Sequence, residues 1–441
     1  MANIMPFRGT RFDQSVAGEL DQLITLPYDR INKPLQDEYY ARSEYNICRV
    51  IKGREFSADT DQENVYTRSG ATWHEWIARG VVKPDAEPAL YVYYQTFTAE
   101  GREHTRRGLC AMVELQDYST GAVKPHERTL DAPKEDRFRL FMTTDTHFGQ
   151  IFQLYPDDNN EIAGLLARDT ERPADIDAVI DEEGDVRHRM WAVDDPRTVE
   201  AVREMMQANL LFIADGHHRY ETALRYRDFR LKEYVGGEGG HNPRFAMMTL
   251  VGMSDPGLVV LPTHRVLFDL PDFSADKLVH DLARYFAVKS ENTYEQLRAQ
   301  MDAARADYER NVYGLYSGGR FWLFELRERG IMDQLAAEHS AAWRSLDVAV
   351  LHEVVLEHLL GIDKAAQAAK TNLSYDRLAG MSIGRVDKGT HQAAIFMNPT
   401  KLAQIREVAG KGEVMPQKST DFYPKLIDGM VTCQVDLGAK R

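Results

Sequence analysis

The segment Leu210–Leu224, LLFIADGHHRYETAL, places an acid, two histidines and an arginine directly after an apolar run. Gly216 permits a sharp turn and lets the backbone approach a ligand closely. The start of the helix that follows offers backbone N–H groups and the positive end of the helix dipole, which together attract anions. Arg219 adds a forked donor that matches phosphate oxygens. These residue types in this order favour the binding of nucleotide phosphates.

The remaining polar residues of the turn allow more than one role. His217 and His218 can donate hydrogen bonds to phosphates, and Asp215 could hold a magnesium ion or orient a histidine. An acid before a helix is also a common N-cap, and histidine and arginine at such a place can simply be solvated. A site in which both histidines bind one metal is awkward, because consecutive helical side chains point about 100° apart.

Regular elements are expected on both sides of this turn. Residues 196–209 carry apolar side chains at helical spacing, and residues 210–214 form an apolar strand before the turn. Two β-rich runs at residues 89–98 and 106–115 predict a hairpin. Asn398 is expected to cap a helix that has Pro399 in its first turn. Strands alternate with helices along the chain, which predicts an α/β (α+β) fold with a mixed sheet in a layered core.

The length of 441 residues predicts two domains. We expect a catalytic region at residues 1–270 and a C-terminal α/β region at residues 271–441, packed on the first.

Composition excludes several classes of protein. The net charge is −14, whereas proteins that grip phosphate backbones are usually basic, so nucleic acid is not the expected partner. No apolar segment approaches the roughly 20 residues that span a bilayer, and the N-terminus has no secretory signal, so we expect no membrane partner and a cytoplasmic location. The three cysteines stand far apart without a CxxC pair, which argues against a disulfide framework or a zinc site.

Two further segments could supply a catalytic base. In LPYDRI, Asp29 could accept the proton of an attacking hydroxyl, or it could be a turn acid that caps the next helix. The segment KPHERTL could form a basic loop that closes over phosphates, with Glu127 as an alternative base or metal ligand. A solvated run of charges is the other interpretation of this segment. Its candidate nucleotide-binding residues are His126, Arg128 and Thr129.

Two more segments carry candidate substrate-binding residues. LPTHRV places His264 and Arg265 at the end of a predicted strand, where α/β sheets present ligand groups. MPQKST offers Lys418, Ser419 and Thr420 as a compact set of donors, although the glycine-rich frame of a P-loop is missing. Such residues also serve as ordinary loop anchors.

The turn at Asp215–Arg219 resembles the shared motif of the ParB/sulfiredoxin superfamily, in which a strand runs into Gly-x-x-Arg at a helix start that binds nucleotide phosphates. The free-serine kinases of that superfamily carry a similar Asp-Gly-His-His-Arg segment. Sulfiredoxins have a cysteine at the position of His217, so their sulfur chemistry is not implied. ParB proteins add a DNA-binding helix-turn-helix, for which this chain shows no basic signature.

Nearly the whole chain resembles the bacterial domain of unknown function (DUF) 1015 family through a series of ordered motifs. These motifs are LPYDRI (26–31), KPHERTL (124–130), PKEDRFRLF (133–141), LYPD (154–157), VRHRMW (186–191), FIADGHHRYETAL (212–224), LPTHRV (261–266), LDVAVLHE (346–353) and GEVMPQKSTDFYPKL (412–426). The chain departs from the family pattern at Arg30, where a small apolar residue is usual, and at Asp421, where an aromatic residue is usual. These two departures concern specificity more than fold.

Together, the residues and the resemblances imply a ParB/sulfiredoxin-like enzyme that transfers a phosphoryl group from ATP or ADP to the hydroxyl of a small metabolite. Free L-serine is the first candidate acceptor by similarity alone. Mg²⁺ would bridge the phosphates, with Asp215 as its protein ligand, and positioning and charge would carry most of the catalysis. Two alternatives stay open: a regulatory switch that binds a nucleotide with little turnover, and a metal-dependent hydrolase that uses the histidine pair.

Overall fold

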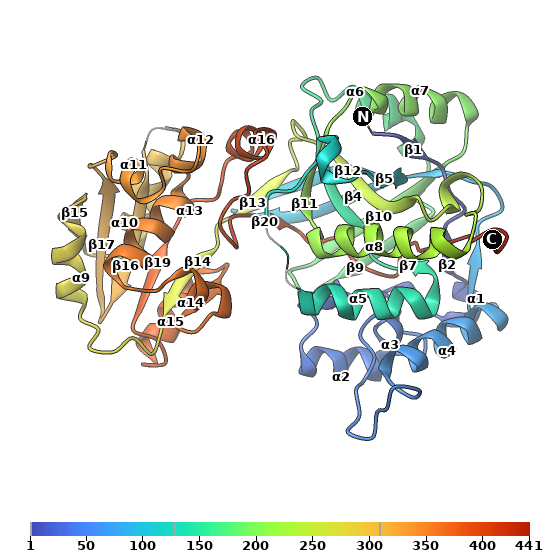
Figure 1. Cartoon of the computed structure of the whole chain (residues 1–441), viewed down its shortest axis with the longest axis horizontal. Coiled ribbons are helices and arrows are strands. Elements are labelled where there is room, and N and C mark those ends of the chain that lie inside the picture. The colour runs from blue at the N-terminus through green and yellow to red at the C-terminus, as the bar shows by residue number, and fades with distance from the viewer. Residues whose placement is uncertain (1, 128, 130, 308–309) are drawn as a thin grey trace. The chain divides into compact units, whose positions relative to one another are not determined.

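The computed structural model describes residues 2–127, 129, 131–307 and 310–441, and these residues form two compact units (Figure 1). Unit 1 consists of the described residues of Met1–Pro125, Thr129–Val259 and Pro424–Arg441. Unit 2 consists of those of His126–Arg128 and Val260–Tyr423. Both units are therefore discontinuous in sequence, whereas a single boundary after residue 270 was expected. The C-terminal residues fold back into unit 1.

Unit 1 is built around a mixed sheet that has nine strands in the described part of the chain. The strands follow the order β6-β11-β8-β12-β5-β4-β10-β9, and β1 pairs with β5. The pairs β6–β11 and β8–β12 are parallel, and the other pairs are antiparallel. This arrangement confirms the predicted mixed sheet and the hairpin, which is β4–β5. The strands are β1 (Ile4–Met5), β4 (Leu90–Ala99), β5 (Arg102–Glu114), β6 (Val123–Lys124), β8 (Ile151–Tyr155), β9 (Ile176–Ile180), β10 (Val186–Val193), β11 (Leu211–Asp215) and β12 (Phe245–Gly252).

Helices flank this sheet, and α5 and α8 run side by side in unit 1, with α2, α3 and α4 on the far side of α5 (Figure 1). Among the described residues, no helix has both the length and the apolar content needed to cross a membrane. Two short ladders, β2 (Thr10–Phe12) with β3 (Val82–Pro84) and β7 (Thr146–His147) with β21 (Cys433–Gln434), complete the unit. Its α-helices are α1 (Gln14–Ala17), α2 (Lys33–Arg42), α3 (Cys48–Ile51), α4 (Val65–Ala78), α5 (Asp131–Thr144), α6 (Glu161–Leu166), α7 (Pro196–Gln207) and α8 (His217–Glu233).

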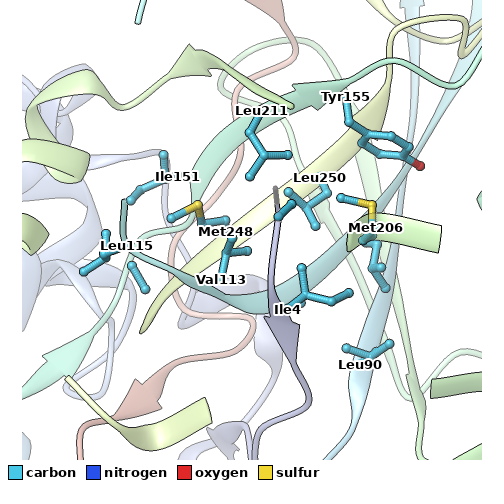
Figure 2. Close-up of a cluster of buried hydrophobic side chains, with 14 of the residues drawn as sticks. Ile4, Leu90, Val113, Leu115, Ile151, Tyr155, Met206, Leu211, Met248 and Leu250 are labelled. Atoms are coloured by element: carbon cyan, nitrogen blue, oxygen red, sulfur yellow. The ribbon is translucent and has the colours of Figure 1, made fainter. Parts of the chain in front are cut away.

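The core of unit 1 explains why the strand before the Asp-Gly-His-His-Arg turn is so apolar. The first four side chains of β11 are all buried, as expected of a strand inside a sheet that is covered on both faces. Figure 2 shows Leu211 of β11 in one cluster with Met248 and Leu250 of β12. Helix α7 buries Val202 and Met206 in the same cluster. The sheet and its packed helices thus fix the place where β11 ends.

Unit 2 contains a second, antiparallel sheet with six strands among the described residues, in the order β15-β17-β16-β19-β14-β18. Its strands are β14 (His264–Leu267), β15 (Phe286–Glu291), β16 (Val312–Ser317), β17 (Arg320–Leu326), β18 (Leu373–Asp376) and β19 (Ala393–Phe396). A separate ladder joins β13 (Val259–Leu261) to β20 (Asp421–Tyr423). The helices are α9 (Ala275–Leu282), α10 (Tyr294–Arg305), α11 (Ile331–Leu335), α12 (Ala341–Arg344), α13 (Asp347–Val350), a π-helix (Leu351–Leu359), α14 (Lys364–Ala369), α15 (Ala379–Asp387) and α16 (Leu402–Gly410).

One predicted helix start in unit 2 is wrong. Helix α16 begins at Leu402 after the N-cap residue Lys401, not after Asn398 with Pro399 in the first turn. Instead, the side-chain amide of Asn398 donates a hydrogen bond to the carbonyl of Met301. This tertiary contact holds Asn398 away from the role of a cap.

The core position of β11 can be tested with two adjacent leucines. Leu211 is fully buried, whereas the side chain of Leu210 is 41% exposed. We expect Leu211→Ala to lower the free energy of unfolding by about 2–5 kcal/mol, because it removes buried methyl groups and leaves a cavity. Leu210→Ala is the matched control and should change it by no more than about 0.5 kcal/mol. Urea unfolding of both variants measures the difference, and equal losses would contradict this placement of β11.

Candidate functional site

The Asp-Gly-His-His-Arg turn joins the end of β11 to the start of α8, as the sequence predicted. Gly216 is the N-cap residue and has φ of +91°, a conformation that favours glycine. A Cβ atom at this position would lie 2.9 Å from Nε of Arg219, so a side chain there would displace the guanidinium group. Glycine therefore allows Arg219 to fold back over the turn, at the positive end of the dipole of a 17-residue helix.

Contacts along α8 fix the direction in which it leaves the turn. The hydroxyl of Tyr220 donates a hydrogen bond of 2.7 Å to the carbonyl of Gln116. The ring of Tyr226 stacks on Phe141 of α5 with 3.7 Å between ring centroids, and its hydroxyl donates to Asp145 at 2.6 Å. Buried contacts of these two aromatic side chains thus hold the helix against its neighbours and fix the position of its first turn.

The acid of the turn forms an ion pair with a lysine from the C-terminal segment. Nζ of Lys425 lies 3.0 Å from Oδ2 of Asp215, and these side chains are 13% and 30% exposed. A guanidinium nitrogen of Arg219 lies 4.0 Å from Oδ1 of the same carboxylate. Burial alone would raise the pKa of Asp215, but the two cations outweigh this effect and hold the pKa well below its usual range. Asp215 is therefore ionised at neutral pH and shared between Lys425 and Arg219.

Two cross-strand partners in the central hairpin hold the backbone of this lysine. Gln95 of β4 and Arg106 of β5 face each other, and the guanidinium of Arg106 donates to the side-chain oxygen of Gln95. Arg106 also donates to the carbonyl of Pro424 at 2.6 Å, and Gln95 donates to the carbonyl of Lys425 at 2.9 Å. Arg106 is only 1% exposed, and burial lowers its pKa to about 10. A buried polar pair on the sheet thus positions Lys425 at the turn.

The segment LPYD reaches the same region through backbone pairing with the C-terminal segment. Thr25 and Asp428 exchange two backbone hydrogen bonds, of 3.1 and 2.9 Å. Three residues later, the ring of Tyr28 lies under the guanidinium of Arg137, 4.0 Å from its central carbon. Asp29 follows in an exposed 3₁₀ turn, and its charge acts on Arg219 and Asp428.

Asp29 does not cap the helix that follows it, as one interpretation of the sequence suggested. The N-cap of α2 is Asn32, whose side chain accepts a hydrogen bond from the backbone N–H of Leu35. Arg30, the residue that departs from the family pattern, forms an ion pair of 2.7 Å with Glu183. The role of Asp29 as a base remains a prediction.

Arg219 is fixed by the protein as well as by the turn. One of its terminal nitrogens donates to the carbonyl of Gln150, whose side chain accepts a hydrogen bond from Thr249. Burial lowers the pKa of Arg219, but Asp215, followed by Asp428 and Asp29, more than offsets this effect, so the net pKa is raised. Arg219 is thus a permanently charged group, held in place at the first turn of α8. His217 is buried beside it, and His218 is half-buried.

The candidate residues of KPHERTL are divided between the two units. In unit 2, Nε2 of His126 lies 2.9 Å from the hydroxyl of Thr420, and Glu127 accepts from the backbone N–H of Lys418 at 3.3 Å. In unit 1, the hydroxyl of Thr129 donates to Glu221 of α8 at 2.7 Å. Arg128 lies outside the described residues.

Unit 2 also places the other candidate residues close to one another. Arg265 is 1% exposed, and it donates to Nε2 of His352 at 3.0 Å and to the carbonyl of Lys418 at 3.1 Å. His264 is 2% exposed, and its Nδ1 accepts from a backbone N–H at 3.3 Å. The hydroxyl of Ser419 donates to the carbonyl of Pro416. Protein contacts account for the burial of these side chains, and their substrate-binding role remains a prediction.

The geometry of Asp215 does not fit a role as a magnesium ligand. Its carboxylate is bonded to Lys425 and faces Arg219, and two cations this close would repel a third. In the part of the chain that the structure describes, no group of three or more His, Cys, Asp or Glu side chains is arranged to hold a metal ion. Mg²⁺ that enters with a nucleotide would take phosphate oxygens and water as ligands instead.

The sequence analysis missed the residues that complete the site but lie far from the turn in sequence. Lys425 and Asp428 lie in the segment PKLID, in which a lysine and an acid interrupt an apolar run. Arg106, by contrast, lies in the polar first half of β5, REHTRR, where its sequence neighbours do not distinguish it. Charged residues inside apolar runs are rarely buried without partners, and this signal could have marked Lys425 and Asp428.

The ion pair at the turn predicts a pH-dependent contribution to stability. The pKa of Asp215 is lower in the folded protein than in the unfolded chain, so the stability that it contributes is complete above about pH 4 and is lost as the pH falls through the folded-state pKa. Lys425→Met should lower the free energy of unfolding at pH 7 by about 1–2 kcal/mol, a value reduced for partial exposure. The deficit should shrink below about pH 4, as measured by urea unfolding.

The exposed Lys232 near the end of α8 offers a matched control. Lys232→Met should leave the stability nearly unchanged at both pH values. A deficit in Lys425→Met that stays constant between pH 7 and pH 3 would show that the ion pair does not depress the pKa of Asp215.

Several solved structures are similar to this chain. A conserved hypothetical protein from Pyrococcus furiosus is 14% identical, with a TM-score of 0.34, and the match covers 74% of this chain and 95% of that one. A free serine kinase in complex with AMP is 11% identical, with a TM-score of 0.37 and coverage of 74% and 92%. SbnI from Staphylococcus aureus, with a C-terminal truncation, is 11% identical, with a TM-score of 0.33 and coverage of 73% and 86%.

Similarities at these identities and TM-scores do not indicate the activity of this chain. No curated protein matches the chain. The profile of the family described as "Protein of unknown function (DUF1015)" matches residues 4–349, which is most of the chain. The chain therefore belongs to the DUF1015 family, as its ordered motifs predicted.

Proposed function

We propose that unit 1 binds ATP or ADP at the Asp-Gly-His-His-Arg turn and transfers a phosphoryl group to the hydroxyl of a small metabolite. The observation that carries this proposal is the position of Arg219. Its guanidinium lies over a glycine turn at the positive end of α8, and the acids around it keep it charged. A helix start with a fixed forked cation suits the charge and the shape of a phosphate group.

The surrounding charges support transfer as well as binding. Phosphoryl transfer needs cations at the transferring group and a carboxylate that can accept the proton of the attacking hydroxyl. Lys425 and Arg219 are two cations that unit 1 places at the turn. Asp29, the predicted base in unit 1, lies close enough to Arg219 for its negative charge to raise the pKa of that side chain. Free L-serine is the first acceptor to test, because the turn resembles that of the free-serine kinases.

The two alternatives predict different behaviour. A regulatory switch would bind the nucleotide with little turnover. A metal-dependent hydrolase would need a cluster of metal ligands at the histidine pair, and the described residues offer no group of three or more. No observation in the described part of the chain favours the hydrolase.

Removing the cation at the turn should weaken nucleotide binding. We expect Arg219→Ala to raise the Kd for ATP or ADP with Mg²⁺ by about 10- to 150-fold, because one charge-assisted pair contributes about 1.5–3 kcal/mol. Isothermal titration calorimetry measures this change. Arg225→Ala is the matched control, since Arg225 lies on the same helix, is half exposed and pairs with Glu135.

Phosphorus NMR with ATP or ADP, Mg²⁺ and a set of small alcohols that includes L-serine then tests transfer. We expect a phosphomonoester signal that requires the acceptor and is absent with Arg219→Ala. Binding without that signal would favour the switch. Equal affinity in Arg219→Ala and Arg225→Ala would place the nucleotide elsewhere, and circular dichroism of each variant checks that it is folded.

A further inference from the structure

A small cavity in unit 1 adjoins the first turn of α8. Its volume is about 70 Å³, and its walls come from the 3₁₀ turn at Tyr28, from α5, from residues 146–151 and from α8. Most of the lining is apolar, with Phe141 and Phe148 among the wall residues. Arg219 and Asp428 also line it. The cavity therefore connects the proposed phosphate-binding arginine with a carboxyl group that the sequence analysis did not single out.

Asp428 is the unusual member of this lining. The residue is 3% exposed, and its Oδ1 has no hydrogen-bond partner among the described residues. Gly149 makes room for it, because a Cβ atom at that position would lie 2.8 Å from Oδ1 of Asp428 and 3.2 Å from a terminal nitrogen of Arg219. The carboxyl oxygen and the guanidinium thus approach the same point. A buried carboxyl oxygen without a hydrogen-bond partner destabilises the fold unless a ligand supplies the missing hydrogen bond.

Burial, partly opposed by the facing charges, gives Asp428 a pKa suited to proton transfer near neutral pH. Burial raises its pKa to about 7, with Arg219 and Arg137 opposing the rise and Asp29 adding to it. Besides the two arginines, His147 and Tyr28 are titratable groups in the lining of the cavity. Burial lowers the pKa of His147 to about 3, and burial raises the pKa of Tyr28 to about 12. Neither of these two groups changes its charge near pH 7. An effective general base has a pKa close to the working pH.

The size of the cavity limits what it can enclose. An apolar cavity of about 150 Å³ holds a benzene ring, so 70 Å³ encloses roughly three non-hydrogen atoms. A nucleoside is far larger than this. The hydroxymethyl end of a small molecule fits, with the remainder of that molecule outside.

We propose that Asp428 is the general base of the transfer reaction and that this cavity receives the hydroxymethyl end of the acceptor; this inference rests on the proposed function. The acceptor hydroxyl gives its proton to Oδ1 of Asp428 while its oxygen forms a bond to the terminal phosphorus of the nucleotide. The bond between that phosphorus and the bridging oxygen breaks, and the electron pair leaves with the shortened nucleotide. Asp428 then returns the proton to solvent.

Asp428 differs from the other two candidate bases in its surroundings. Asp29 is exposed to solvent, and Glu127 accepts a hydrogen bond from the backbone of Lys418 in unit 2. Oδ1 of Asp428, by contrast, is sheltered from water, has no partner among the described residues and lies beside Arg219. A sheltered carboxylate is a stronger proton acceptor than a solvated one.

The test measures transfer to small primary alcohols, L-serine included, by phosphorus NMR with wild type, Asp428→Asn and Asp29→Asn. Calorimetry gives the ATP affinity of each protein, and thermal unfolding shows that each is folded. We expect Asp428→Asn to bind ATP within about threefold of wild type and to lose at least about 100-fold in transfer rate. Asp29→Asn should lose less. Wild-type transfer should rise with pH to a plateau above about pH 7, and the residual transfer by Asp428→Asn should lack this rise.

The outcomes separate this inference from the function on which it rests. Transfer by Asp428→Asn within about threefold of wild type, or a wild-type rate that is flat from pH 5.5 to 8.5, would overturn the role of Asp428 and leave the kinase activity standing. ATP binding by wild type without transfer to any alcohol would overturn the kinase activity and the base role together. Since the pH profile uses the wild-type protein, the inference is tested even if a variant fails to fold.

Discussion

The ion pair between Asp215 and Lys425 is the constraint on which the rest of the site depends. It joins residues that are 210 positions apart, and it places a lysine against the carboxylate at the end of β11. A charge that leaves water needs a partner of opposite sign and hydrogen bonds for its remaining atoms. The pair of Gln95 and Arg106 meets part of this need by holding the backbone at Pro424 and Lys425. The hairpin, the turn and the C-terminal segment are thus mutually dependent.

The same constraint gives the discontinuous chain path of unit 1 a physical reason. Pro424–Arg441 belongs to unit 1 although the preceding residues belong to unit 2. Within this segment, Lys425 compensates Asp215, and the backbone at Asp428 pairs with Thr25. The segment therefore completes the turn on one side and fixes the start of LPYD on the other. Without it, the carboxylate of Asp215 would lose the partner that lies 3.0 Å away and would keep the more distant guanidinium of Arg219.

Local sequence patterns predicted the parts of the site that local physics decides. The apolar run, the glycine and the following helix are each set by neighbours in the chain, and β11, Gly216 and α8 follow as expected. The role of Lys425 depends on a partner far away in the sequence, which no periodicity reveals. Asn398 illustrates the same limit, because a tertiary hydrogen bond to Met301 overrides its preference for a helix cap. Motif spacing thus predicts helices and strands better than it predicts which charged side chains form ion pairs.

The position of Arg219 between two acids couples phosphate binding to the basicity of Asp428. Arg219 lowers the pKa of the Asp428 carboxyl, because its positive charge favours the ionised form. A phosphate bound to Arg219 would share that charge and add negative charge nearby. Both effects raise the pKa of Asp428, so its ionised form is a stronger base when the nucleotide is in place, while a smaller fraction of the carboxyl is ionised near pH 7. By linkage, an acceptor hydroxyl that donates to Asp428 would in turn strengthen the hold on the phosphate. The buried acid and the arginine would thus favour transfer only when both substrates are bound.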